Sequence, residues 1–435
     1  MPRAAAHHHH HRACRPRRPL RTGALAVLTC LLAGLTVLAA GASAQRLRPR
    51  LAGGRQQCAD PYSSIRNPAN PLDLAQAPGS DPLNGAQFFV PGPAHGSAAS
   101  QIATLLGINP ETLPADESWA DFDRRLQTGP LAARLAADPT LAHDVDALAL
   151  IAAEPEAQRI SSVSEGGGPG AIFKQTEKIL CQNMQADPGT VPIFNTYFLH
   201  PVLGGCPTPA QVTAYDPVFH RRVDEMAAAI DRRPAVLLLE IDAIGSSSCI
   251  ARSRAMRGWE ADLRYEINAM RALPHTVVYI EGGYSDSNSV GYTARILNAI
   301  GVDHIRGFFT NDTHNNWTSK EVGWATAISR RTGGAHFIVN TSNNGRGPLL
   351  NAHPTAEGVE NLCNPPGRGL GPRDATDTGV PSADAFLWTH PPGNSSGHCG
   401  GAGAPSSGAF WWQYAVGLAD RANGQLGPGF PSLPY

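Results

Sequence analysis

The stretch Pro234–Cys249 decides the expected fold; its sequence is Pro-Ala-Val-Leu-Leu-Leu-Glu-Ile-Asp-Ala-Ile-Gly-Ser-Ser-Ser-Cys. The apolar run 235–239 has no polar alternation, which is typical of a strand buried on both faces in a parallel sheet. Two carboxylates, Glu240 and Asp242, follow it and would share one face of an extended strand. In a barrel of parallel strands the carboxyl ends carry the chemistry, so we predict a site here. The alternative is that Asp242 caps a helix and Glu240 forms a structural ion pair.

Composition narrows the class of protein. The chain has 435 residues and 42% hydrophobic content, which suffices for one barrel or for two to three smaller domains. A net charge of -1 gives no electrostatic reason to expect binding to nucleic acid or to a membrane surface. Charged residues make up only 16%, while Gly (45) and Pro (37) are abundant, which is typical of a loop-rich exported protein.

The N-terminus has the features of a secretory signal peptide. Several arginines precede an apolar run at 24–40, and small residues follow at 42–44. This order predicts cleavage after Ala44, so that residues 1–44 are removed and the protein is secreted. A retained membrane anchor is the alternative, but the run is short for a bilayer span.

Six cysteines remain beyond that segment. They are Cys58, Cys181, Cys206, Cys249, Cys363 and Cys399. An even number in an exported chain predicts disulfides, although the sequence alone does not choose their pairing. The chain has no Cys-x-x-Cys or Cys/His ligand spacing, so we expect no structural zinc.

The pattern of residues predicts an α/β fold. Residues 45–83 are rich in Pro, Asn and Ala and predict an extended arm, and apolar spacing predicts two or three scaffold helices within 100–153. Strands and helices then alternate, which favours a closed barrel of parallel strands as a single domain, 84–435. The predicted strands are 191–197, 235–242, 276–281, 304–309, 336–341 and 383–389. The predicted helices between them are 217–232, 259–272, 290–300 and 320–331.

The segments after these strands are rich in amides, hydroxyls and aromatic rings. Aromatic rings that stack on sugars and amides that bind hydroxyls are typical of a carbohydrate groove. The alternative is that these Asn- and Gly-rich loops are only turns. No Gly-x-Gly-x-x-Gly, Gly-x₄-Gly-Lys-Ser/Thr or Gly-x-Ser-x-Gly motif follows a strand, which argues against nucleotide binding and serine hydrolysis.

Seven short segments carry a more specific pattern. They are Asp-Pro-Leu-Asn-Gly-Ala-Gln-Phe-Phe-Val (81–90), Leu-Glu-Ile-Asp (239–242), Tyr-Ile-Glu-Gly-Gly-Tyr (279–284), Arg-Gly-Phe-Phe-Thr-Asn (306–311), Phe-Ile-Val-Asn-Thr-Ser-Asn-Asn-Gly (337–345), Cys-Asn-Pro-Pro-Gly-Arg-Gly-Leu-Gly (363–371) and Asp-Ala-Phe-Leu-Trp-Thr-His-Pro-Pro-Gly (384–393). In this order they resemble glycoside hydrolase family 6, the cellobiohydrolase II and related endoglucanase family. The resemblance implies a distorted (β/α) barrel with about seven parallel strands and inverting hydrolysis of β-1,4-glucan. It also implies the disulfides Cys206–Cys249 and Cys363–Cys399, which leaves Cys58 and Cys181 as an extra pair.

The resemblance places Asp242 at the position of the general acid. An inverting enzyme also needs a base that activates water. The family's base falls at Ser396 here, and its lysine partner at His390. We therefore expect water to be activated through a chain or by a relocated carboxylate such as Glu281 or Asp286. Other departures from the family pattern are Gly205, Asn343, Asn394 and the segment Glu281-Gly-Gly-Tyr284.

Three functions remain open from the sequence. The first is a secreted endoglucanase with an open cleft, because the segments between the cysteines are short for the family. The second is a glycosidase on a non-cellulosic polysaccharide, suggested by Leu362, and the third is a catalytically silent glycan-binding protein. We expect a monomer that needs no cofactor or metal, binds a polysaccharide, and binds neither nucleic acid nor a membrane. The expected substrate-binding residues are Tyr197, Asn311, Asn316, Trp317, Trp388, His390 and Asn394.

Overall fold

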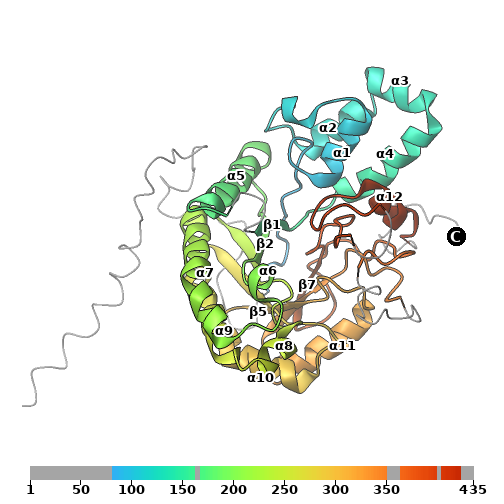
Figure 1. Ribbon diagram of the computed structural model, residues 1–435. Helices are drawn as coiled ribbons and strands as arrows, with labels where there is room; N and C mark the ends of the chain where they lie inside the picture. Colours follow the sequence, from blue (N-terminus) through green and yellow to red (C-terminus); the bar gives the residue numbers. More distant parts are fainter. Residues whose placement is uncertain (1–80, 162–166, 350–362, 399–402, 423–435) are drawn as a thin grey trace, which may run out of the picture. The chain divides into compact units, whose positions relative to one another are not determined.

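Seven parallel strands form one sheet whose spatial order equals the chain order (Figure 1). The structure is a computed structural model that describes residues 81–161, 167–349, 363–398 and 403–422. The strands are β1 (Gln158–Ser161), β2 (Ile193–Tyr197), β3 (Ala235–Leu239), β4 (Thr276–Glu281), β5 (Gly307–Thr310), β6 (His336–Asn340) and β7 (Ala383–Leu387). The predicted α/β fold with about seven parallel strands is confirmed. The predicted signal peptide, most of the predicted arm, and Cys58, Leu362 and Cys399 lie outside the described residues.

The two edges of the sheet approach each other without a strand ladder in the described part of the chain. The amide of Ala157, just before β1, donates to the carbonyl of Trp388, just after β7, at 3.4 Å. Asn195 in β2 donates to the carbonyl of Thr389 at 2.7 Å. The sheet is therefore a distorted barrel, in which the amino end of β1 lies beside the carboxyl end of β7.

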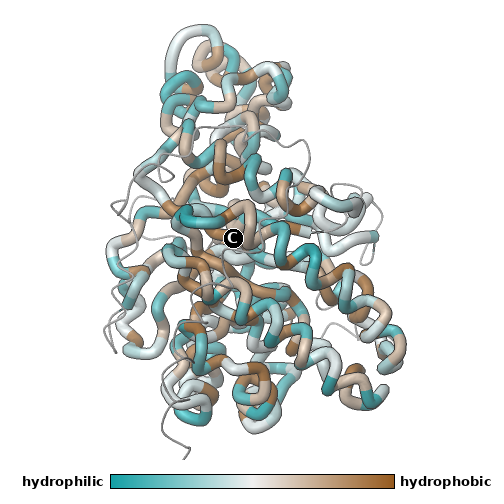
Figure 2. Tube along the Cα trace, turned by 90° about the vertical axis from the view of Figure 1, so that its left-hand side faces the viewer, coloured by the Kyte–Doolittle hydropathy of each residue, from teal (hydrophilic) through white to brown (hydrophobic). Residues whose placement is uncertain are grey.

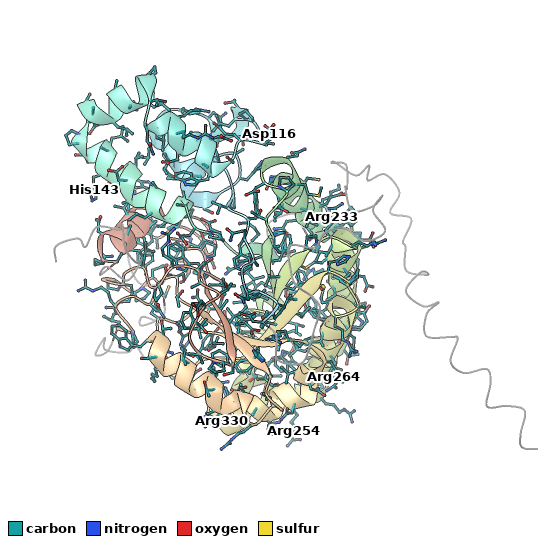
Figure 3. All side chains as sticks on the ribbon, turned by 180° about the vertical axis from the view of Figure 1, so that it is seen from behind. Asp116, His143, Arg233, Arg254, Arg264 and Arg330 are labelled. Carbon is teal, nitrogen blue, oxygen red and sulfur yellow. A yellow bond between two sulfur atoms is a disulfide. The ribbon has the colours of Figure 1, made fainter. Side chains whose placement is uncertain are left out.

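Five helices follow one another around the outside of the sheet (Figure 1). They are α5 (Ala171–Ala186), α7 (Pro209–Ile230), α9 (Met256–Met270), α10 (Val290–Ile300) and α11 (Thr318–Ser329). Hydrophilic and hydrophobic residues alternate along them (Figure 2), as expected of helices with one face on a sheet. Arg254, Arg264 and Arg330 lie on the outer side (Figure 3). Strand β3 is fully buried on both faces, as its apolar run predicts.

A second core joins the N-terminal helices to the end of the described chain. It contains Phe122, Leu148, Trp388 and Leu418. The helices are α1 (Ser97–Leu105), α2 (Trp119–Leu126), α3 (Gly129–Ala137), α4 (Pro139–Ala152) and α12 (Trp412–Asp420). The range 100–153 is helical, as predicted, but it is occupied by parts of four α-helices, α1 to α4, where we predicted two or three. No helix in the described ranges is both long and apolar enough to span a bilayer.

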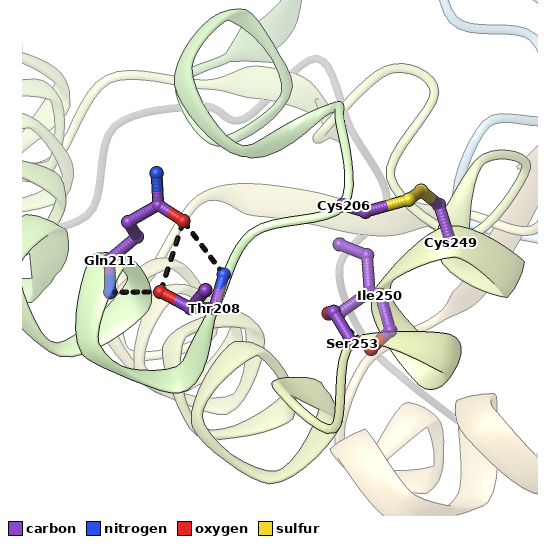
Figure 4. Close-up of a disulfide and its surroundings, with 6 residues drawn as sticks. All are labelled: Cys206, Thr208, Gln211, Cys249, Ile250 and Ser253. Carbon is purple, nitrogen blue, oxygen red and sulfur yellow. Dashed lines mark hydrogen bonds between the residues drawn. A yellow bond between two sulfur atoms is a disulfide. The ribbon is translucent and has the colours of Figure 1, made fainter.

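Helix α7 begins eight residues before the predicted start. We predicted a start at Pro217 from the apolar residues that recur at helical spacing over 217–232. Instead, Thr208 and Gln211 form a capping box, in which the Thr208 amide donates to the Gln211 side chain at 2.8 Å (Figure 4). The capped start outweighs the cost of Pro217 inside the helix.

The predicted disulfide Cys206–Cys249 is present, with a Cα–Cα distance of 4.9 Å (Figure 4). It joins the approach to α7 to α8 (Ser247–Arg252). Cys181 and Cys363 are also disulfide-bonded. The partners that we predict for them are outside the described residues, so these two pairings stay predictions.

The chain after β3 differs from the extended strand that we predicted. Strand β3 ends at Leu239, and Glu240 and Asp242 adopt left-handed backbone conformations with φ of 56° and 63°. The expectation that both carboxylates share one face of an extended strand is therefore wrong. Glu240 instead accepts hydrogen bonds from the backbone amides of Phe198 (2.9 Å) and Leu199 (2.8 Å). The structural alternative thus applies to Glu240, with backbone amides rather than a cation as its partners.

Candidate active site

Asp242 lies just beyond the carboxyl end of β3 and is partly exposed. Its Oδ1 accepts a hydrogen bond from the Tyr284 hydroxyl and lies 2.7 Å from Oγ1 of Thr313. The two hydroxyls are themselves 2.8 Å apart. One carboxylate oxygen is thus held by two groups, which fixes the direction of the other.

The Tyr284 ring is held between two neighbours. It stacks on His314 with a centroid distance of 3.7 Å and an interplanar angle of 8°. On another side it approaches Gly245 so closely that a Cβ there would lie 2.3 Å from Cε2 of Tyr284. Gly245 therefore permits the position from which Tyr284 reaches Asp242.

We expect Gly245→Ala to lower both stability and any hydrolytic activity. The added methyl group must displace the buried Tyr284 ring, at a cost of about 1–3 kcal/mol in the free energy of unfolding. Denaturant unfolding and hydrolysis rates of the purified variant measure both effects. The matched control is Gly323→Ala in α11, where a Cβ meets nothing within 4 Å and the helix gains propensity. Equal stability and equal hydrolysis rates of the two variants would show that Gly245 is not needed for the position of Tyr284.

Glu281 anchors the loop that carries Asp242. It is fully buried, and its Oε2 accepts from the amides of Ile244 (2.6 Å) and Gly245 (3.1 Å). Its Oε1 accepts from the amide of Gly283 at 2.6 Å. Burial raises the pKa of Glu281 to about 8, with the charge of Asp242 adding to the effect. Because both oxygens are bound to backbone, these contacts favour a structural role for Glu281 over the catalytic role considered from the sequence.

Asp286 is bound to two side chains at the edge of the site. It lies 2.9 Å from Nδ1 of His314 and 2.8 Å from Nδ2 of Asn316. Burial alone raises its pKa, but these bonds and the charge of His314 outweigh burial and hold the pKa of Asp286 below its usual value. A lowered pKa makes a carboxylate a weaker base, so this geometry also gives little support to Asp286 as the base.

Thr313 lines a hollow of about 360 Å³, a volume that includes open solvent. The hollow brings together four of the positions at which the chain departs from the family pattern, namely His390, Asn394, Ser396 and Asn343. The other lining residues are Asp312, Thr313, His314, Asn315, Asn364, Pro365 and Tyr414. These four substitutions therefore surround one space, which Thr313 connects to Asp242.

Asp312 is a buried carboxylate of this hollow that the sequence analysis missed. It follows Asn311 directly after β5, and its Oδ1 accepts a hydrogen bond from the Thr389 hydroxyl. The signal that could have identified it is an extra acidic residue immediately after the motif 306–311, at a strand's carboxyl end.

Arg159 is a second functional candidate that the sequence analysis missed. It is in the short, polar strand β1, which apolar patterning did not detect. Its Nη2 lies 3.2 Å from Nδ1 of His390, and its guanidinium lies 5.6 Å from the centroid of the Tyr197 ring. Burial, together with the charge of Arg159, lowers the pKa of His390 to about 3. His390 is therefore neutral near pH 7, and Arg159 supplies the positive charge of this region.

The expected substrate-binding residues fall into two groups. Asn311, Asn316 and Trp388 are fully buried and hydrogen-bonded to the protein, so they shape the loops instead of facing a ligand. Trp388 was expected to bind substrate, but its ring is instead packed in the second core. His390 and Asn394 line the hollow, Tyr197 is partly buried beside Arg159, and Trp317 is 44% exposed. Across the described ranges, His, Cys, Asp and Glu form no group of three that could hold a metal ion.

Comparisons with known proteins agree with this architecture. The family model described as glycosyl hydrolases family 6 matches residues 211–422. Endoglucanase A of Thermobispora bispora is 30% identical over 222 residues, which cover 49% of this chain and 45% of that protein. Endoglucanase 1 of Streptomyces sp. (strain KSM-9) is 30% identical over 244 residues, which cover 54% of this chain and 63% of the relative. The matched region thus spans less than two thirds of either relative.

A solved structure extends the similarity over most of the fold. The endoglucanase Cel6 of Mycobacterium tuberculosis superposes with a TM-score of 0.59 at 26% identity, covering 79% of this chain and all of that chain. That endoglucanase was solved in complex with methyl-cellobiosyl-4-deoxy-4-thio-β-D-cellobioside. Together, the family model over residues 211–422, the two relatives and this structure support the assignment of the chain to the glycosyl hydrolases family 6.

Proposed function

We propose that this protein is a secreted endoglucanase that hydrolyses β-1,4-glucosidic bonds with inversion and uses Asp242 as the general acid. The observation that carries the proposal is a partly exposed carboxylate, fixed by two hydroxyls, at the carboxyl end of β3 and beside a polar hollow. The match to the family model and the endoglucanase names of the relatives support the substrate class. The protein acts as a monomer on a polysaccharide.

The contacts of Asp242 suit proton donation. In its protonated form the carboxyl gives its proton to the glycosidic oxygen as the bond to the anomeric carbon breaks. The carboxylate that remains is stabilised by the hydroxyls of Tyr284 and Thr313, since hydrogen bonds to an ionised acceptor are stronger than those to a neutral one. Tyr284 and Thr313 therefore act as positioning residues for the acid.

The small amount of loop between Cys206 and Cys249 supports an open cleft. The two cysteines are 43 positions apart, and most of the intervening residues form α7 and β3. Little chain is left there to cover a bound polysaccharide. This supports cleavage within a glucan chain rather than at its end.

We expect the purified protein to lower the viscosity of a soluble β-1,4-glucan early in the reaction. Internal cleavage shortens the chains before many reducing ends appear, so viscosity should fall faster than reducing sugar rises. Viscometry and a reducing-sugar assay on the same samples test this. A cellobiohydrolase, which releases cellobiose from chain ends, is assayed in parallel for comparison. Release of cellobiose alone, without a fall in viscosity, would contradict the endo mode.

Glycan binding without hydrolysis is the second candidate, because Ser396 occupies the position of the family's base. A panel of β-glucans and other polysaccharides, assayed for both binding and reducing-sugar release, separates the candidates. Release of sugar from a non-cellulosic polysaccharide alone would show that this polysaccharide, and not a β-1,4-glucan, is the substrate. Binding with no release from any of them would support the binding protein.

A further inference from the structure

Three residues that line the hollow each have a buried hydrogen-bond acceptor without a donor in the described part of the chain. The acceptors are Oδ2 of Asp312, Oδ1 of Asn343 and Oδ1 of Asn394. Buried polar atoms are nearly always hydrogen-bonded, and an acceptor alone can be satisfied only by a donor that enters from outside the protein. Water and sugar hydroxyls are donors of this kind. The hollow is therefore built to receive an O–H group.

Asp312 is the one charged acceptor among the three. Its side chain is 1% exposed, and its Oδ1 is held by the Thr389 hydroxyl. This bond fixes the carboxylate and leaves Oδ2, which is buried, as its oxygen without a hydrogen-bond partner. The next residue, Thr313, contacts Asp242 at 2.7 Å, so one short loop connects the two carboxylates.

The electrostatics of Asp312 suit a base. Burial raises the pKa of Asp312 to about 6, while the charge of Arg159 and the Thr389 bond act in the opposite direction. A base is most effective when its pKa lies near the working pH. His390 is less suited, because its pKa is lowered to about 3 and its Nδ1 faces Arg159.

We propose that Asp312 is the general base of this protein and that its Oδ2 activates the attacking water in the hollow. The inference rests on the proposed hydrolysis with Asp242 as acid. In the step, Asp312 takes one proton from the water while the water oxygen bonds to the anomeric carbon. The bond from that carbon to the glycosidic oxygen breaks, its electron pair stays on the oxygen, and Asp242 protonates it. Asp312 then releases its proton to solvent, and Asp242 takes up a proton from solvent.

The test compares Asp312→Ala and Asp312→Asn with Asp242→Asn and Asp286→Asn in the full chain. We expect both Asp312 variants to lose about 10²–10⁴-fold in kcat on a soluble β-1,4-glucan. The Asp312→Asn variant should fold normally, because it keeps an acceptor for Thr389 and removes a buried charge. Thermal unfolding checks this. The Asp286→Asn variant should lose far less, since Asp286 is engaged with His314 and Asn316.

Azide gives a readout that a structural role would not produce. In Asp312→Ala, azide fits the space of the lost carboxylate and attacks the anomeric carbon without needing a base. The product from a β-1,4-glucan is then an α-glycosyl azide, which mass spectrometry and NMR identify. We expect azide to restore turnover in Asp312→Ala and not in Asp242→Asn.

The outcomes separate this inference from the proposed function. A wild type that hydrolyses glucan, with Asp242→Asn inactive but Asp312→Asn fully active, overturns the role of Asp312 alone. Azide rescue of an Asp286→Ala variant instead of Asp312→Ala does the same and assigns the base to Asp286. A wild type that releases no sugar from any glucan overturns both proposals.

Discussion

Replacement of Asp242 by Asn is expected to lower glucan hydrolysis by about 10²–10⁴-fold, the contribution of a positioned general acid. Asparagine keeps an acceptor for Tyr284 and Thr313 but has no proton to give to the leaving oxygen. Binding of the glucan and the melting temperature should therefore stay close to wild type. Steady-state hydrolysis, binding to a glucan and thermal unfolding of the same preparation measure the three quantities.

An aryl glycoside with an acidic phenol provides the control for Asp242→Asn. Its leaving group departs without protonation, so the variant should lose much less activity on this substrate than on a glucan. The Asp286→Asn variant should lose little activity, and about the same amount on the aryl glycoside as on the glucan. A strongly lowered melting temperature of Asp242→Asn, or unchanged glucan hydrolysis, would make Asp242 a structural residue and favour the glycan-binding alternative.

The second large effect that we expect is a loss of stability as the pH rises from about 5 to about 8. Burial raises the pKa of Glu240 to about 7 and that of Glu281 to about 8. A carboxyl group whose pKa is higher in the folded state than in the unfolded state binds its proton more tightly when folded. It stabilises the fold fully below the unfolded pKa, and this contribution is lost as the pH rises through the folded pKa. Since a pKa difference of one unit corresponds to about 1.4 kcal/mol, Glu281 alone contributes on the order of a few kcal/mol.

Buried histidines lower the stability of the folded protein on the acid side. Burial lowers the pKa of His95 to about 4 and that of His390 to about 3. These side chains bind a proton more weakly when folded, so stability also falls as the pH drops below about 6.5. We therefore expect the greatest stability near pH 5–6.

Denaturant unfolding between pH 4 and pH 9 measures this profile. In Glu281→Gln the free energy of unfolding should decrease less steeply above about pH 6 than in the wild type. This change of slope is expected whatever the variant's stability at a single pH. An exposed carboxylate variant, Asp303→Asn, serves as the control and should leave the slope unchanged. A wild-type stability that stays constant or increases from pH 6 to pH 8 would contradict the ionisation states described for these carboxyls.

Local sequence signals determined those elements whose boundaries depend only on neighbouring residues. The predicted strand 276–281 and helix 290–300 have the observed bounds. The helix is bounded by Ser289, whose side chain accepts from the Tyr292 amide, and by Gly301 with φ of 87°. The apolar run after Pro234 likewise predicted a doubly buried strand and placed Asp242 at its end.

The polar details of the site depend on residues that are distant in the chain. Arg159 and His390 are 231 positions apart, and they meet because β1 and β7 form the two edges of the barrel. Asp312 and Thr389 are 77 positions apart and meet beyond the carboxyl ends of β5 and β7. Local patterns contain no information about such pairs, since hydrogen bonding and burial at these positions arise only when the sheet closes.

The sequence by itself thus determined the class of fold, the family resemblance and the position of Asp242, because apolar periodicity and contiguous motifs are local properties. Tertiary structure decided which carboxylates are free to act. It bound both oxygens of Glu281 to backbone amides, engaged Asp286 with His314, and left one oxygen of Asp312 without a protein donor. The physical reason is that the proton affinity and the reach of a carboxyl group depend on the atoms packed around it, and folding brings those atoms from separate parts of the chain.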